Sequence, residues 1–279
     1  MTSLAARVLK LYTRRVIRTT RKLSKTDLVR HLRRTMDNPP PLPFMMPPMV
    51  RLTTFRDGIQ NHGTQNHGIH GDWLQVKSAK RAVLYLHGGG YVAGVTKTYH
   101  PLCSRLATEL RADVFLPDYR LAPEHPYPAA VDDAVATYDM LLAHGWKPEH
   151  LVIAGDSAGG GLTLATLLRL RDEGKPLPAC AIVMSPYADM TGTAASIAGN
   201  DKTDALLGHA MISGGKGIYV PDPAREREPG ASPVFGDFSG LPPLLVTVEE
   251  GECLRDDAYA VMARAKEAGV HATLISRRG

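Results

Sequence analysis

The sequence lacks the features that mark several classes of protein. Its three cysteines, Cys103, Cys180 and Cys253, form no C-x-x-C pair and no Cys/His cluster, so we expect neither a disulfide framework nor a structural zinc site. No run of 18 apolar residues occurs, which argues against a membrane-spanning helix. The chain also does not open with the apolar stretch of a secretory signal, because basic residues between Arg7 and Arg18 interrupt it. These absences favour a cytoplasmic protein.

Acidic residues are nearly absent from the first 36 positions. This segment holds eleven lysines and arginines against one acid, Asp27, although the whole chain of 279 residues has a net charge of only +5. The rest of the chain is therefore acidic. This argues against nucleic-acid binding, since such a domain spreads its basic residues over folded elements. Peripheral contact of residues 1–36 with an anionic membrane remains open.

The basic segment has apolar residues at helical spacing, which predicts two helices. The first contains Leu4, Val8, Leu11 and Tyr12, and the second contains Leu28, Val29 and Leu32. Either their apolar faces pack on the main domain as part of a cap, or their basic faces hold the protein against lipid.

A proline-rich stretch at 39–48 follows the two helices and predicts an extended connector. We expect its Phe44, Met45 and Met46, together with Met49, to cover apolar surface. Further on, Asn-His-Gly occurs at 61–63 and again at 66–68. The repeat predicts a turn-rich loop and not a metal site, because no acid stands at ligand spacing.

From Ala82 onward, short apolar runs alternate with helical stretches. The runs at 82–86, 112–116, 151–154, 180–184, 244–248 and 271–275 predict strands, and the stretches at 99–110, 128–144, 158–172 and 256–268 predict helices. Buried strands separated by helices are typical of a mostly parallel sheet covered on both faces, that is, an α/β fold. We expect an arm and cap at 1–75 and a catalytic domain at 76–279, with a cap insertion at 187–240.

Two glycine-rich loops follow predicted strands directly. Gly155-Asp156-Ser157-Ala158-Gly159 is a G-x-S-x-G between a strand and a helix, a turn that projects the serine hydroxyl above the sheet. His87-Gly88-Gly89-Gly90 lets backbone N–H groups approach a ligand, and their expected use is to donate hydrogen bonds to an oxyanion during acyl transfer.

With these motifs the chain resembles the hormone-sensitive-lipase-like branch of the α/β-hydrolases, the bacterial family IV carboxylesterases. The matching segments are YLHGGGY at 85–91, DYRLAPEHPYPAAVDD at 118–133, GDSAGGG at 155–161 and LPPLLVTV at 241–248. The resemblance implies that Ser157 is the nucleophile and that the N–H groups of Gly89, Gly90 and Ala158 form the oxyanion hole. It further implies that His87, Gly88 and Asp156 support these loops, and that Asp118, Arg120, Glu124 and His125 are scaffold.

The family pattern places the catalytic acid after the strand that ends at Val248. That register selects Glu252, makes Asp256 the acid that begins the next helix, and leaves Asp257 as the alternative. The triad histidine should come after the acid, yet the one histidine beyond Glu252 is His271, which we expect at the wrong edge of the sheet. His209 precedes the acid and is a poorer candidate. We therefore expect the chain to end about three residues short of its histidine and to retain only residual catalysis, roughly 10³–10⁴-fold over water.

The implied reaction is hydrolysis of short- to medium-chain acyl esters, without metal or organic cofactor. The alternative is a non-catalytic ligand-binding or decayed member of the same fold. A third hypothesis is a membrane-surface protein that acts through its basic arm. A homodimer is left open.

Overall fold

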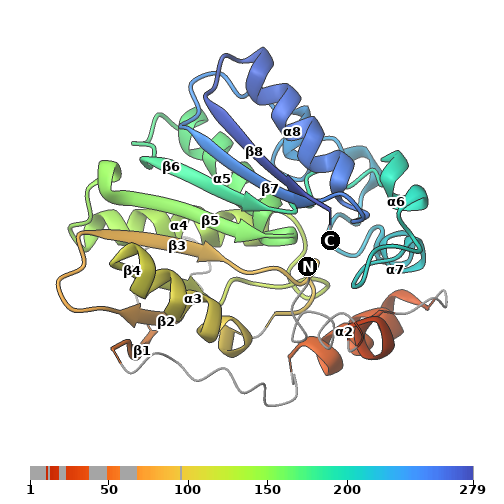
Figure 1. The fold of residues 1–279 in the computed structure, drawn as a ribbon, viewed down its shortest axis with the longest axis horizontal. Helices are drawn as coiled ribbons and strands as arrows, with labels where there is room; N and C mark the ends of the chain where they lie inside the picture. Colours follow the sequence, from red (N-terminus) through yellow and green to blue (C-terminus); the bar gives the residue numbers. More distant parts are fainter. Residues whose placement is uncertain are drawn as a thin grey trace.

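Strands of five or six residues form one sheet in the computed structural model, which describes residues 11, 13–18, 23–37, 49–56, 68–94 and 96–278 (Figure 1). The strands are β1 (Arg51–Arg56), β2 (His70–Gln75), β3 (Arg81–Leu86), β4 (Ala112–Pro117), β5 (Leu151–Asp156), β6 (Cys180–Met184), β7 (Leu244–Glu249) and β8 (Ala272–Arg277). All six strands predicted from the sequence are present, with ends that differ by at most two residues.

The strand order is β1-β2-β4-β3-β5-β6-β7-β8. β1 is antiparallel to β2 and β2 to β4, whereas every later pair is parallel. The carboxyl ends of β3, β5, β6 and β7 therefore meet at one edge of the sheet, where ligands bind in open α/β folds.

The sheet begins earlier than the boundary expected at residue 76, because β1 and β2 belong to it. Neither strand has the continuous apolar pattern of the parallel strands. β1 is almost entirely exposed at the sheet edge, and β2 mixes Gly71 and Asp72 with Trp73 and Leu74. Their pairing depends on contacts with distant strands, which local periodicity does not reveal.

Side chains of the central strands alternate between two apolar layers. Val83 and Tyr85 of β3 contact the layer that contains Cys103 and Ala107 of α3 (Thr96–Leu110). Leu84 of β3 contacts the opposite layer, together with residues of α4 (Ala129–Ala143), α5 (Ala158–Asp172) and α8 (Arg255–Glu267). Burial on both faces explains why these strands are apolar without interruption.

The four helices predicted around the sheet are α3, α4, α5 and α8. The remaining helical elements are η1 (Thr13–Ile17), α2 (Lys25–Met36), η2 (Pro148–His150), α6 (Ala195–Gly199), α7 (His209–Gly215), η3 (Pro223–Arg225) and η4 (Pro233–Phe235). Those from α6 to η4 all lie in the segment between β6 and β7. In Figure 1, α2 lies beside α7, so that the basic segment and the insertion at 187–240 meet.

Candidate active site

Ser157 lies in a strained turn between β5 and α5. Its φ of 52° and ψ of −121° fall outside the common regions for an L-residue, and its N–H donates to the Met184 carbonyl at 2.9 Å. The flanking glycines allow this turn: a Cβ on Gly159 would lie 1.9 Å from the Leu86 carbonyl oxygen, and one on Gly155 would lie 2.3 Å from that of Gly159. The serine thus stands at the N-terminus of α5, above the carboxyl edge of the sheet.

The glycine loop after β3 lies against this turn. Gly89 and Gly90 have φ values of 120° and 64°, and both line the same cavity as Ser157. A Cβ on Gly89 would lie 1.8 Å from the Ala93 carbonyl oxygen, so the loop requires glycine there. The backbone N–H groups of Gly89, Gly90 and Ala158 donate to no other described residue. They are available to a ligand at this position.

Asp156 connects the two loops. Its carboxylate accepts hydrogen bonds from the hydroxyls of Tyr85 and Tyr99, each at 3.0 Å, and from the Gly88 N–H at 3.2 Å. Burial raises the pKa of Asp156, and these donors oppose that rise. The contacts hold the glycine loop to the end of β5.

His87 is fully buried beneath the glycine loop and faces away from solvent. Its Nδ1 lies 2.7 Å from the Gly88 carbonyl oxygen, its ring stacks on Tyr119 at 4.2 Å, and the Tyr119 hydroxyl donates to the His87 carbonyl at 2.7 Å. Burial lowers the pKa of His87 to about 4, so the ring is neutral at pH 7.

Glu252 is half-buried in the loop after β7. Its carboxylate accepts a hydrogen bond from the hydroxyl of Ser185, the residue that follows β6. The residue before Ser185 is Met184, whose carbonyl accepts a hydrogen bond from the Ser157 N–H. The bond between Ser185 and Glu252 therefore joins the loop of Glu252 to the serine turn. Burial raises the pKa of Glu252, and the Ser185 bond partly opposes it. Sequence reasoning missed Ser185, although its place at the carboxyl end of a parallel strand was a usable signal.

The alternative acid, Asp257, is engaged elsewhere. It is 3% exposed, and one of its oxygens accepts the N–H groups of Ala188 at 2.8 Å and Asp189 at 3.0 Å. Burial raises its pKa to about 7. Asp256 lies in the first turn of α8, as predicted, and accepts the Ser196 N–H at 2.8 Å.

Of the two histidines weighed as the base, His271 lies at the opposite edge of the sheet from Ser157. The His271 carbonyl accepts the N–H of Leu244 at the start of β7, so it is separated from Glu252 by the length of a six-residue strand, roughly 20 Å. His209 begins α7 and is exposed. Among the residues that the structure describes, no histidine hydrogen-bonds to the Ser157 side chain.

An apolar cavity of about 150 Å³ lies beside Ser157. Leu28, Leu32 and Met36 of α2 form part of its wall. The rest comes largely from the insertion, with Met190, Leu206, Leu207, Met211, Ile212, Ile218, Tyr219 and Val220. An ion pair between Lys216 and Glu226, at 3.2 Å, also lines it. The cavity can hold a small apolar group next to the serine hydroxyl.

The second helix predicted in the basic segment is confirmed as α2, and its Leu28, Val29 and Leu32 are buried in the core. Arg33 of the same helix bonds to the Val92 and Ala122 carbonyls and to Glu124. Contact of this segment with anionic lipid stays a prediction, as does contact between copies of the chain. None of the helices that the structure describes is long and apolar enough to cross a bilayer.

Several expectations fall outside the described residues, namely the first helix around Leu4 and Val8, the connector with Phe44, Met45 and Met46, and most of the Asn-His-Gly repeat. Met49 is described and is 73% exposed, so the expectation that it covers apolar surface is wrong. Within the described ranges no group of three His, Cys, Asp or Glu residues could hold a metal ion.

Comparisons with known proteins agree with this geometry. The model of the alpha/beta hydrolase fold family matches residues 83–279. The chain is 37% identical over 223 residues to an esterase of Acinetobacter venetianus, covering 80% of this chain and 74% of the relative. It is 43% identical over 205 residues to an acetyl-hydrolase of Streptomyces hygroscopicus, covering 72% and 68%. The solved structure of an esterase from the bacterial hormone-sensitive lipase family superimposes with a TM-score of 0.83 at 35% identity, over 100% of this chain and 89% of the other.

Proposed function

Because the chain belongs to the hormone-sensitive-lipase-like branch of the alpha/beta hydrolase fold family and is a hydrolase that acts on esters, we propose that Ser157 is its nucleophile. One observation carries the proposal. The Ser157 turn opens on an apolar cavity beside three backbone N–H groups, those of Gly89, Gly90 and Ala158, that bond to no other described residue. This combination suits an acyl group whose carbonyl oxygen becomes negative as the serine attacks.

The proposed reaction is transfer of the acyl group to Ser157. The hydroxyl oxygen forms a bond to the ester carbonyl carbon as its proton passes to a base, and the three N–H groups hold the oxyanion. In a triad this base is an imidazole, and none of the histidines that the structure describes bonds to the Ser157 side chain. Collapse of the intermediate expels the alcohol, which takes the proton, and water then releases the acid by the same steps. No metal or organic cofactor is required.

Glu252 is proposed as the acid that orients the imidazole. Its carboxylate is the one in the loop joined through Ser185 to the serine turn, whereas Asp257 is committed to two backbone N–H groups. A carboxylate in this role holds the tautomer and stabilises the imidazolium, and Glu can replace Asp there.

Short- to medium-chain acyl esters are the proposed substrates. The cavity of about 150 Å³ is far smaller than the roughly 300–1,000 Å³ of pockets for drug-sized ligands. Its wall combines α2 with the segment at 187–240, which we propose to act together as a cap over Ser157.

Hydrolysis of p-nitrophenyl acetate, butyrate and octanoate by the wild type and by Ser157→Ala tests the proposal. We expect Ser157→Ala to lose the hydrolysis that the wild type shows, and a sulfonyl fluoride to label the peptide that contains Ser157. Undiminished hydrolysis by Ser157→Ala would refute the nucleophile. An ester that binds but is not turned over by the wild type would favour the non-catalytic alternative.

A further inference from the structure

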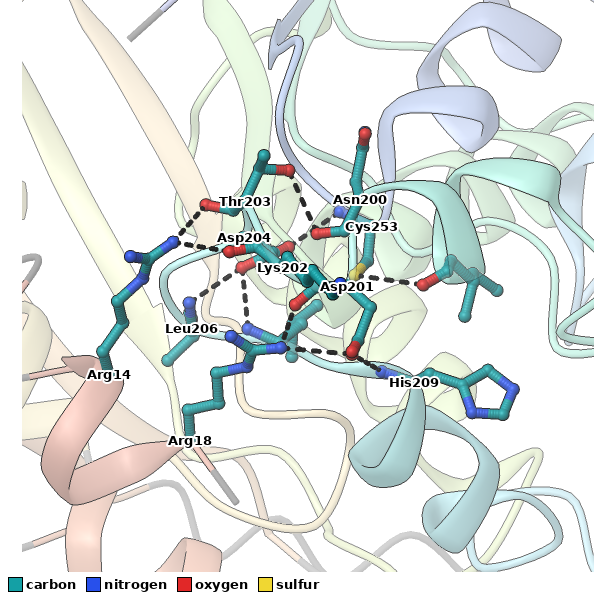
Figure 2. A network of polar contacts seen from close by, with 12 residues as sticks. Arg14, Arg18, Asn200, Asp201, Lys202, Thr203, Asp204, Leu206, His209 and Cys253 are labelled. Carbon is teal, nitrogen blue, oxygen red and sulfur yellow. Dashed lines mark hydrogen bonds and ion pairs between the residues drawn. The ribbon is translucent and has the colours of Figure 1, made fainter. Parts of the chain in front are cut away.

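The segment at 200–204, which follows α6, bonds directly to the loop that contains Glu252 (Figure 2). The side-chain amide of Asn200 donates to two carbonyls of that loop, that of Glu250 at 2.9 Å and that of Glu252 at 2.8 Å. Both amide hydrogens are thereby used. The Glu252 carbonyl also accepts the Arg255 N–H at 3.2 Å, whereas the Glu250 carbonyl accepts no backbone N–H outside helices and strands among the described residues and depends on the Asn200 side chain.

The same segment makes further bonds to this loop. Asp204 is 3% exposed, and its Oδ2 accepts the Cys253 N–H at 2.7 Å while its Oδ1 accepts the N–H groups of Leu206 and Leu207. The Thr203 hydroxyl donates to the Gly251 carbonyl at 2.8 Å. Every residue from 250 to 253 is therefore held by a bond from 200–204 to its backbone.

The outer side of the segment is held by the basic arm. Arg18 bonds to the carbonyl and, at 3.1 Å, to the carboxylate of Asp201, and its side chain is only 11% exposed. Arg14 donates to the carbonyls of Lys202 at 2.8 Å and Thr203 at 3.0 Å. Figure 2 shows both guanidinium groups pointing at the segment from the side of the arm. The arm bonds to Asp201, Lys202 and Thr203, and the Glu252 loop bonds to Asn200, Thr203 and Asp204, so that both contact the segment at 200–204.

We propose that Asn200 and Asp204 are positioning residues for the catalytic acid. Their bonds to the backbone of 250–253, together with that of Thr203, form what we call the brace, and Arg14 and Arg18 support it from the arm. The inference rests on the role proposed for Glu252. The brace holds the backbone of 250–253 so that the carboxylate stays on the Ser185 hydroxyl. Because an orienting acid acts through geometry, a loosened brace lowers kcat and leaves substrate binding nearly unchanged.

Asn200→Asp is the sharpest test, since it keeps the shape of the side chain but places an oxygen against two carbonyl oxygens. We expect kcat for p-nitrophenyl acetate to fall about tenfold or more with KM within about twofold. In a Glu252→Gln background the same change should cost less than about twofold, because the acid it positions is gone. Lys202→Ala, which removes an exposed side chain from the same segment, should match the wild type.

A similar loss of kcat with and without Glu252 would reduce Asn200 to a structural role and overturn the proposal, as would an unchanged kcat. Should Asn200→Asp fail to fold, Arg18→Gln serves instead: it removes the ion pair with Asp201, and a fall in kcat confined to the background that retains Glu252 is again expected.

Hydrogen exchange at 249–254 gives a readout that needs no turnover. Faster exchange in Asn200→Asp than in Lys202→Ala is expected, and equal exchange would overturn the brace itself. If Ser157→Ala instead proves as active as the wild type, the proposed function fails while the exchange result still decides the brace.

Discussion

The hydroxyl of Ser185 donates to the carboxylate of Glu252, and this bond joins the loops that follow β6 and β7. Ser185 itself has a φ of 44°, and its N–H donates to the Thr247 carbonyl at 2.7 Å. The hydroxyl therefore approaches the carboxylate from a backbone held by the neighbouring strand.

Ser185→Ala should lower kcat/KM by roughly tenfold, because a hydrogen bond to a charged group contributes about 1.5–3 kcal/mol. The bond opposes the burial that raises the pKa of Glu252, so its loss should raise that pKa further. The acid limb of the pH–rate profile should then move to higher pH. Rates of p-nitrophenyl acetate hydrolysis between pH 5 and 9 measure both effects. A lower rate whose acid limb stays at the wild-type pH would contradict the role of Ser185 in stabilising the charged Glu252 carboxylate.

Glu252→Gln and Asp257→Asn separate the two candidate acids. In a chain that carries the triad imidazole, we expect Glu252→Gln to lower kcat by about 10²–10⁴-fold, because a neutral amide cannot stabilise the imidazolium. Asp257→Asn keeps an oxygen that can accept both the Ala188 and Asp189 N–H groups, so its kcat should stay within about threefold of the wild type. The reverse order of losses would move the acid to Asp257.

Local sequence patterns predicted the parts of the site that lie within one strand-turn-helix unit. Ser157 is an example, because the glycines that permit its turn stand two residues to either side. Ser185 and Asn200 were missed because their partners lie 67 and 52 residues away, at Glu252, and only the order of β6 and β7 in the sheet brings them together. β1 was missed for a similar reason, since its pairing with β2 leaves no apolar alternation in its own residues.

Met211→Trp should shorten the range of acyl chains that are hydrolysed, because Met211 is 6% exposed and lines the cavity beside Ser157. A bulkier ring there takes space from a cavity of only about 150 Å³. We expect kcat/KM for the octanoate ester to fall about tenfold or more, with the acetate ester within about twofold. Met49→Trp makes the same change on a side chain that is 73% exposed and should affect neither ester. Parallel losses on both esters would indicate that Met211 does not border the acyl chain.

Asp257 should make the protein less stable as the pH rises, because burial raises its pKa to about 7 in the folded protein from roughly 3.9 in the unfolded chain. Between these values the folded state binds a proton that the unfolded state does not, so the free energy of unfolding falls as the pH rises from about 4 to about 7. Asp257→Asn is neutral throughout and keeps the acceptor. Its free energy of unfolding should therefore exceed that of the wild type by an amount that grows over this range and levels at roughly 1–4 kcal/mol above pH 7.

Urea unfolding of both proteins at pH 5, 6, 7 and 8 measures this difference. Asp257→Leu is the matched control: it also removes the charge but leaves the N–H groups of Ala188 and Asp189 without their acceptor, so it should be less stable than Asp257→Asn at every pH. A difference between wild type and Asp257→Asn that does not vary with pH would mean that the carboxyl group titrates alike in the folded and unfolded chains. In that case burial would not raise the pKa of Asp257 in the folded protein.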